Sequence, residues 1–168
     1  VISNRAKTLI FADLKRQSVL KFLIWAAASL RLKVADPTYN KEKIKEAIDC
    51  AEQKGTRLIV LPELCVTSYT CADLFFTKSL QHSAENALKE IIKYTSGKNI
   101  VAAVGMPVPF YNSLYNCAVV IGNGRIYGIV PKIHLANYNE FYEKRWFASG
   151  SDFKSCQNID FCGFETTI

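Results

Sequence analysis

Short apolar runs alternate with segments of helical periodicity in this chain, and this alternation limits the folds that it can adopt. Three of the apolar runs have the length of a buried strand, and they cover Lys21–Ser29, Arg57–Leu61 and Asn99–Gly105. Two segments between them, Lys41–Gln53 and Lys78–Tyr94, place apolar residues at helical spacing. Strands that alternate with helices predict an α/β fold in which helices cover at least one face of a sheet.

Local signals predict where some of these elements begin and end. Asn40 is a suitable N-cap for the first helix, because an asparagine side chain can accept a hydrogen bond from the first helical turn. Gly55 is expected to end that helix as a C-cap, since glycine adopts a positive φ without strain. An Asn-Gly pair separates the apolar runs Tyr115–Ile121 and Arg125–Val130. Such a pair predicts a β-hairpin with a tight type I′ turn.

Composition narrows the class of protein. The 168 residues suit one domain, and a content of 49% hydrophobic and 21% charged residues excludes a disordered tail or a small disulfide scaffold. The longest apolar runs, Phe22–Leu30 and Ile100–Val108, are too short to span a bilayer, so no membrane segment is expected. The net charge of +6 comes from basic residues spread along the chain, without a basic cluster interleaved with aromatics. We therefore expect no nucleic-acid partner.

The six cysteines are expected to be free thiols in a reducing cytosol. No two of them have the C-x-x-C spacing of a structural zinc site. His82 and His134 also lack partners at metal-ligand spacing, so we predict no metal site in this chain. Val1–Arg16 lacks the continuous hydrophobic stretch of a secretory signal. Residues 1–19 are interpreted as an N-terminal extension of a cytoplasmic protein.

Two ionisable residues stand directly after predicted strands. Glu63 follows the run Arg57–Leu61, and Lys132 follows the run Arg125–Val130, each separated from its strand by one proline. Ligands of open α/β sheets gather outside the C-terminal ends of the strands. A carboxylate and an ammonium at one edge of a sheet can act as an acid–base pair. A pair of solvated residues at that edge is the alternative that these positions leave open.

A third segment, residues 132–147, mixes polar, charged and aromatic side chains without helical or strand periodicity. Loops of this composition often line binding sites, because aromatic rings form walls and a few polar groups orient a ligand. A surface loop held in place by its aromatic residues would have the same composition. The residues alone leave both interpretations open.

Two of these segments carry motifs of a known family. Residues 61–75 read LPELCVTSYTCADLF, and residues 137–147 read NYNEFYEKRWF shortly after Pro131–Lys132. They resemble the two signatures of the nitrilase superfamily, and more narrowly of the glutamine-hydrolysing domain of glutamine-dependent NAD synthetases. Shorter stretches outside the signatures resemble the same family, namely 26–29, 32–36, 105–108 and 115–116. The resemblance covers residues 20–168, which are interpreted as the N-terminal portion of a carbon–nitrogen hydrolase (glutaminase) domain.

This resemblance implies a fold and a set of site residues. The fold would be a four-layer α-β-β-α sandwich, of which this chain supplies part. In the family's Glu-Lys-Cys triad, Glu63 matches the general base and Lys132 matches the catalytic lysine. Glu143 matches a second family carboxylate, which would keep the lysine charged and oriented. Tyr69 and Tyr138 match positions that line the glutamine pocket.

The implied reaction is hydrolysis of the side-chain amide of glutamine. The ammonia would pass to a synthetase domain that amidates deamido-NAD with ATP and Mg²⁺, while this chain would itself hold no cofactor. The family's nucleophile stands in an Ile-Cys-Glu-Asp type of motif, and none of the six cysteines here is followed by Glu-Asp. The resemblance therefore predicts a chain that stops before its nucleophile. By itself it is expected to be inactive, and either unstable or homo-oligomeric.

Two alternatives stay open, and one residue departs from the motif. A stand-alone nitrilase-type amidase on another small amide would share the Glu and the Lys, but Cys71–Phe75 and Asn139–Glu143 favour the NAD synthetase family. A noncatalytic protein that assembles with a full-length enzyme would keep the same scaffold. Ser68 stands where the family usually has glycine. A positive φ at this position would be costly for serine.

Overall fold

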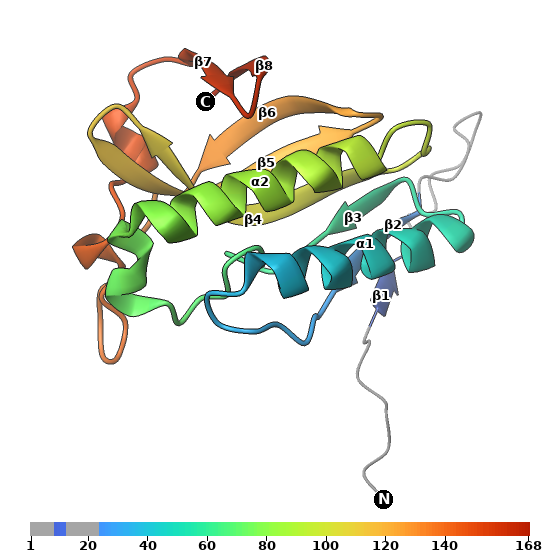
Figure 1. Cartoon of the computed structure of the whole chain (residues 1–168), viewed down its shortest axis with the longest axis horizontal. Coiled ribbons are helices and arrows are strands. Elements are labelled where there is room, and N and C mark those ends of the chain that lie inside the picture. The colour runs from blue at the N-terminus through green and yellow to red at the C-terminus, as the bar shows by residue number, and fades with distance from the viewer. Residues whose placement is uncertain (1–8, 13–23) are drawn as a thin grey trace, which may run out of the picture.

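Two long helices lie side by side on one face of a six-stranded β-sheet (Figure 1). The structure is a computed structural model, and it describes residues 9–12 and 24–168. The helices are α1 Pro37–Gln53 and α2 Lys78–Tyr94. The strands follow one another across the sheet in chain order, as β1 Leu9–Ala12, β2 Trp25–Ala28, β3 Leu58–Val60, β4 Val101–Phe110, β5 Ser113–Gly122 and β6 Arg125–Pro131. The predicted α/β class is confirmed.

The sheet is parallel in its middle and antiparallel on both sides. β2, β3 and β4 are parallel, with α1 in the first connection and α2 in the second. β1 pairs antiparallel with β2, and β4, β5 and β6 form an antiparallel meander. β6 consequently runs in the same direction as β3, so both strands end at the same edge of the sheet. The predicted first strand, Lys21–Ser29, and the predicted extension, residues 1–19, are described only in part. Residues 1–8 and 13–23 lie outside the described residues.

α1 begins earlier than the helical spacing predicts. Asp36 is its N-cap, and the Asp36 carboxylate accepts a backbone hydrogen bond from the first turn at 2.9 Å. Pro37 occupies the first helical position, where its missing N–H costs nothing. The prediction of Asn40 as N-cap is therefore wrong, because Asn40 lies inside the helix and is fully buried. Its side chain instead bonds to the backbone of Lys33 and of Val66.

The other predicted boundaries agree more closely with the structure. Gly55 stands one position after the C-cap Lys54 and has a φ of +75°. α2 has the predicted bounds, and the hydroxyl of its N-cap Thr77 accepts from the first turn. Asn123 and Gly124, between β5 and β6, have φ values of +46° and +74°. Positive φ at both central residues is what a type I′ turn requires, so the predicted hairpin is confirmed.

The main core lies between the sheet and the two helices. Alternate residues of β4 are fully buried, as the two-residue period of a strand with one covered face requires: Ala102, Val104, Met106 and Val108. They belong to the same apolar cluster as residues from both helices, including Ile44, Ile48, Leu88, Ile91 and Ile92. This packing fixes the sheet and therefore the positions at which β3 and β6 end.

The shorter elements of the chain were not predicted. β7 Asn158–Phe161 and β8 Phe164–Thr167 form a separate hairpin beside β6 (Figure 1). Three 3₁₀ turns, η1 Ala72–Phe76, η2 Glu143–Arg145 and η3 Gly150–Asp152, lie in the loops. None of the helices in the part of the chain that the structure describes has the length and hydropathy to cross a membrane.

Candidate active site

Glu63 and Lys132 meet beyond the edge of the sheet, although 69 positions separate them in the chain. Glu63 lies in the loop after β3, and Lys132 directly follows β6. Lys132 Nζ donates a hydrogen bond to Glu63 Oε1 at 2.7 Å. Both residues follow C-terminal strand ends, the place where α/β sheets gather ligands. The structure thus brings together the two ionisable residues that the sequence analysis placed at one edge.

Gly105 allows the loop that carries Glu63 to cross the sheet. β4 and β5 separate β3 from β6, so the two outer strands lie about 14 Å apart at ordinary strand spacing. A Cβ atom at Gly105 would stand 2.5 Å from the Pro62 carbonyl oxygen and from the Leu64 nitrogen. The turn around Glu63 therefore lies directly on the bare backbone of β4. This role was not predicted, because a glycine in a strand can mark a weakened strand, a bulge or the close approach of another backbone, and the sequence alone does not tell these apart.

Glu143 holds Lys132 from the other side. Its carboxylate is buried, with 1% of the side chain exposed. Oε1 accepts hydrogen bonds from Lys132 Nζ at 3.0 Å and from the Tyr69 hydroxyl at 2.5 Å. Oε2 accepts one from the Ala136 backbone N–H at 3.0 Å. Both oxygens of Glu143 are thus engaged, and the ammonium of Lys132 lies between two carboxylates.

This arrangement favours the charged form of Lys132. Partial burial opposes the ammonium, but the hydrogen bonds to Glu63 and Glu143 outweigh it and raise the pKa of Lys132 above its ordinary value. Burial, together with the bond to Glu143, also raises the pKa of Tyr69. The Tyr69 phenol therefore stays protonated and can donate to Glu143. The result is a fixed ammonium beside the sheet edge, where a reacting carbonyl could be polarised.

Glu63 differs from Glu143 in its surroundings. Its Oε1 accepts hydrogen bonds from Asn116 Nδ2 at 2.6 Å and from Lys132. No described residue donates a hydrogen bond to its Oε2, and 42% of the Glu63 side chain is exposed. A carboxylate with one free, accessible oxygen can accept a proton, whereas a buried carboxylate with both oxygens occupied cannot do so without losing a bond. Asn116 was not predicted as a site residue.

Two tyrosines and a phenylalanine form an aromatic group beside these ionisable residues. The Tyr69 and Phe141 rings meet edge to face with centroids 6.2 Å apart, and the Tyr138 and Phe141 rings do so at 5.6 Å. Tyr138 is largely exposed, whereas the Tyr69 hydroxyl is bonded to Glu143. Phe141 therefore holds together the two rings predicted to line a substrate pocket. Their role in binding stays a prediction.

Ser68 has the conformation that the sequence analysis identified as costly. Its φ is +71°, in the left-handed region that favours glycine. The residue lies one position before Tyr69, in the loop that follows Glu63. Serine at this position therefore strains the loop that carries two of the predicted site residues.

All six cysteines are free thiols in the structure. The buried thiols of Cys65 and Cys71 donate hydrogen bonds to the backbone carbonyls of Gly105 and Thr67, at 3.5 and 3.1 Å. Burial raises the pKa of Cys65 to about 12 and also raises that of Cys117. A thiol with a raised pKa is a weak nucleophile near neutral pH. None of the described hydrogen bonds joins a cysteine to Glu63 or Lys132.

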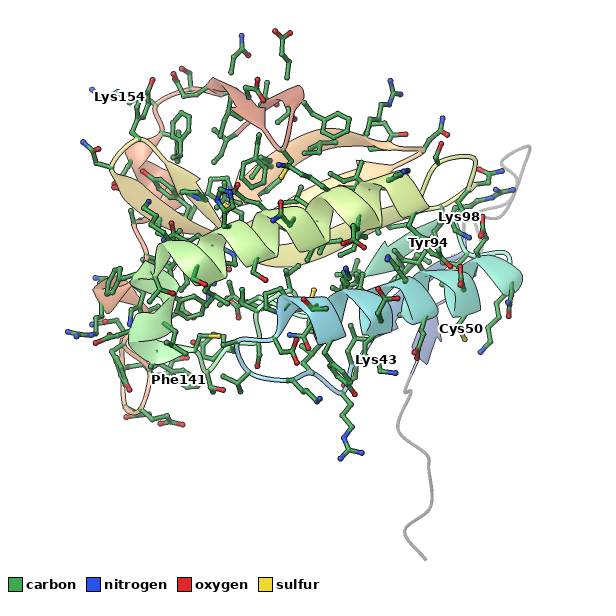
Figure 2. The ribbon with its side chains drawn as sticks, in the orientation of Figure 1. Lys43, Cys50, Tyr94, Lys98, Phe141 and Lys154 are labelled. Carbon is green, nitrogen blue, oxygen red and sulfur yellow. The ribbon has the colours of Figure 1, made fainter. Side chains whose placement is uncertain are left out.

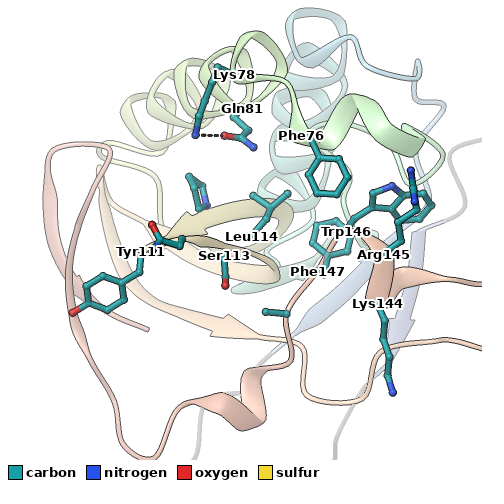
Figure 3. A pocket seen from close by; sticks show the side chains of 13 residues that line it. Phe76, Lys78, Gln81, Tyr111, Ser113, Leu114, Lys144, Arg145, Trp146 and Phe147 are labelled. Carbon is teal, nitrogen blue, oxygen red and sulfur yellow. Dashed lines mark hydrogen bonds between the residues drawn. The ribbon is translucent and has the colours of Figure 1, made fainter.

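A separate pocket of about 610 Å³ is lined by residues around the start of α2, by the turn between β4 and β5, and by residues 144–148 (Figure 3). Figure 3 shows Trp146 and Phe147 at one side of it, facing the start of α2 and the turn between β4 and β5. Trp146 and Arg145 also donate hydrogen bonds to the Asp73 carboxylate, at 2.7 to 2.9 Å. None of the described residues that line this pocket belongs to the Glu63–Lys132–Glu143 group. Within 9–12 and 24–168, no cluster of three or more His, Cys, Asp or Glu could hold a metal ion.

A family model for carbon–nitrogen hydrolases matches residues 25–160. The chain belongs to the carbon–nitrogen hydrolase family. The matched region contains the entire sheet from β2 to β6, both helices, and Glu63, Lys132 and Glu143. The resemblance noted in the sequence is thereby confirmed at the level of the family.

Named relatives of this carbon–nitrogen hydrolase are glutamine-dependent NAD(+) synthetases. The enzyme from Mycobacterium tuberculosis is 33% identical over 129 residues, which are 77% of this chain and 19% of that protein. The enzyme from Oryza sativa subsp. indica is 37% identical over 132 residues, 77% of this chain and 18% of that protein. The chain thus spans about a fifth of the length of the curated relatives that it matches.

Solved structures show the same fold. A glutamine-dependent NAD(+) synthetase from Cytophaga hutchinsonii superposes with a TM-score of 0.78 and 28% identity, over 85% of this chain and 24% of that one. An amidase from Nesterenkonia sp. superposes with a TM-score of 0.63 and 19% identity, over 85% of this chain and 53% of that one. The predicted relation to nitrilase-type folds is therefore confirmed, and the helix and sheet layers seen here are part of that fold.

Proposed function

We propose that this carbon–nitrogen hydrolase takes part in the hydrolysis of the side-chain amide of glutamine. The observation that carries the proposal is the convergence of Glu63, Lys132 and Glu143 on one hydrogen-bonded group, with one oxygen of Glu63 left free. The choice of glutamine is supported by the relatives that are 30% identical or more, which are glutamine-dependent NAD(+) synthetases. The ammonia released would serve the ATP-dependent amidation of deamido-NAD in the longer protein.

The proposed chemistry uses a cysteine thiol as nucleophile. The sulfur attacks the amide carbon of glutamine while Glu63 accepts the thiol proton, and Lys132 stabilises the oxyanion that forms. Glu63 then passes the proton to the amide nitrogen, the carbon–nitrogen bond breaks, and ammonia leaves a thioester behind. Water attacks the thioester with Glu63 again accepting a proton, and that proton returns to the sulfur as glutamate is released.

The proposal assigns the attacking thiol to a segment outside residues 1–168. Three of the thiols here are buried, and those of Cys65 and Cys71 are bonded to backbone carbonyls away from the Glu63–Lys132 pair. Burial raises the pKa of Cys65 to about 12, which suits a core residue and not a nucleophile. ATP and Mg²⁺ are likewise assigned to the synthetase portion of the longer protein, and no step of the amide cleavage involves them.

Substitutions in the full-length protein test this function. Lys132→Ala and Glu63→Gln should each lower glutamine-dependent NAD synthesis by at least about 100-fold. A positioned acid–base group such as Glu63 contributes roughly 10²- to 10⁴-fold, and a group that stabilises the oxyanion contributes roughly 10²- to 10³-fold. Synthesis from free ammonia should stay near the wild-type rate, since it bypasses the amide-cleaving step. Both rates are measured on the same preparations.

Lys98 supplies a matched control. It also lies between two carboxylates, with Nζ at 2.9 Å from Asp49 and 3.0 Å from Glu52. Figure 2 shows Lys98 at the opposite end of the helix pair from Phe141, one of the aromatic residues beside the site. Lys98→Ala should therefore leave both rates unchanged. If the Lys132 and Glu63 variants lose ammonia-dependent synthesis as well, these residues maintain structure and the proposed function fails.

A further inference from the structure

Asn116 is buried beside the Glu63–Lys132 pair and contacts both residues. It lies on β5, between β4 and β6, and only 3% of it is exposed. Its side-chain amide donates a hydrogen bond to Glu63 Oε1 at 2.6 Å. Its backbone carbonyl accepts one from the Lys132 backbone N–H at 2.8 Å. One residue of the sheet is therefore bonded to the side chain of Glu63 and to the backbone of Lys132.

These contacts make the two oxygens of Glu63 unequal. Oε1 accepts hydrogen bonds from both Asn116 and Lys132, and no described residue donates to Oε2. The lone pairs of Oε2 are consequently available for a proton, whereas those of Oε1 are already in use. The Glu63 side chain is too exposed for packing alone to fix its rotamer. Its orientation therefore depends on the two donors that hold Oε1.

The two donors differ in how firmly they fix the position of Glu63. Lys132 is a long, flexible side chain that Glu143 also holds, so by itself it does not keep Glu63 in one position. The Asn116 amide is short, buried and carried by a central strand, so it offers one fixed point. It is also neutral, and a neutral donor orients a carboxylate without adding a second positive charge that would weaken it as a base.

We propose that Asn116 is a positioning residue for amide cleavage, which holds Glu63 by Oε1 and so presents Oε2 to the reacting thiol and the leaving amine. This inference rests on the proposed glutamine hydrolysis and extends it. Asn116 acts through Glu63. Its backbone carbonyl also bonds to the backbone N–H of Lys132, so the residue after β6 is held next to the same asparagine. The reaction thus depends on a residue of the sheet between the two loops that carry the charged groups.

Substitution of Asn116 in the full-length protein should change the rate and its pH dependence. Asn116→Ala should lower kcat for glutamine by roughly 10- to 100-fold, because a misplaced catalytic group can cost about two orders of magnitude. The KM for glutamine should stay within about twofold. The acid limb of the pH–rate profile should move to higher pH, since the ionised carboxylate loses a donor. Asn116→Asp has nearly the same shape but places a second negative charge beside Glu63, so both effects should be larger.

Two controls separate positioning from structure. The backbone carbonyl at position 116 remains in every variant, so the bond to Lys132 N–H is retained. Asn112→Ala changes the same residue type at an exposed turn before β5 and should alter neither rate nor profile. Ammonia-dependent synthesis should stay at the wild-type rate in all three variants. A fall in kcat without movement of the acid limb would mean that Asn116 is only structural, and it would overturn the proposal.

A readout that does not need activity keeps this proposal separate from the proposed function. The Lys132 ammonium can be titrated by ¹³C NMR of its ε-carbon, assigned with Lys132→Arg. In Asn116→Ala, a less firmly held Glu63 should let the pKa of Lys132 fall toward its ordinary value, while Asn112→Ala leaves it unchanged. An identical Lys132 titration in wild type and Asn116→Ala would overturn the positioning role. A wild-type protein that does not hydrolyse glutamine would overturn the proposed function, whatever this titration shows.

Discussion

Ser68 occupies a backbone conformation that its neighbours impose. The Thr67 hydroxyl and the Cys71 thiol both donate hydrogen bonds to the Ser68 carbonyl, at 3.1 and 3.4 Å. Leu64, at the start of the same loop, also has a positive φ, of +51°. The loop from Glu63 to Cys71 is therefore wound tightly, and a side chain at position 68 costs about 1–2 kcal/mol in the left-handed region.

Replacement of this serine should stabilise the protein. Ser68→Gly removes the strain, although the freer unfolded chain offsets part of the gain, so we expect the free energy of unfolding to rise by about 0.5–1 kcal/mol. Ser83→Gly, the same change inside α2, should lower it by about 0.5 kcal/mol because helix interiors disfavour glycine. Urea unfolding monitored by tryptophan fluorescence measures both. Equal destabilisation by the two substitutions would show that position 68 is not strained.

At the scale of elements, the sequence predicted those parts that local patterns define. The apolar stripe of α2 and the Asn-Gly turn between β5 and β6 indicated these elements closely. β4 is longer than the predicted strand Asn99–Gly105, because it continues past Gly105 to Phe110. β3 pairs only with residues 101–103 of β4, so Pro107 and Pro109 stand where that side of β4 needs no ladder hydrogen bonds.

The residues of the candidate site were also predicted only where a local sequence pattern defines them. Family motifs located Glu63, Lys132 and Glu143, and the structure brings all three within hydrogen-bond distance. Asn116 and Gly105 escaped prediction as site residues because their roles come from a loop that crosses β4 and β5. The residues in contact at this crossing are far apart in the chain, so no local sequence pattern indicates it.

Gly105 offers a direct test of that crossing. Gly105→Ala places a Cβ against the backbone of Pro62 and Leu64, so the Glu63 turn must shift. We expect glutamine-dependent synthesis to fall by about 100-fold, as a displacement of the base by about 1 Å would cause. Gly128→Ala, on β6, has its nearest neighbour at 4.0 Å and should be tolerated. Wild-type glutamine-dependent activity in Gly105→Ala would show that the loop does not depend on this contact.

The whole molecule has one covered and one open sheet face. The row Ala26, Ile59, Ala102 and Ile121 crosses four strands and is fully buried under the helices. The next row, which points the other way, is also apolar but is partly exposed, and it consists of Ala27, Val60, Ala103 and Val120. A nitrilase-type sandwich would pack a second sheet on such a face, so the apolar row fits a layer that residues outside 1–168 would contribute in the proposed longer protein.

Val60 tests whether that layer exists. Val60 is 42% exposed here, and Tyr111, at the tip of the β4–β5 turn, is 88% exposed. If both were surface residues, an aspartate at either position would change the free energy of unfolding by no more than about 0.5 kcal/mol. Beneath a second sheet, Val60→Asp would instead bury an unpaired carboxylate and cost several kcal/mol. We therefore expect Val60→Asp to lower the melting temperature of this domain in the full-length protein sharply, and Tyr111→Asp to leave it nearly unchanged. Equal melting temperatures would mean that the open face stays in water and that the sandwich is not completed over β3.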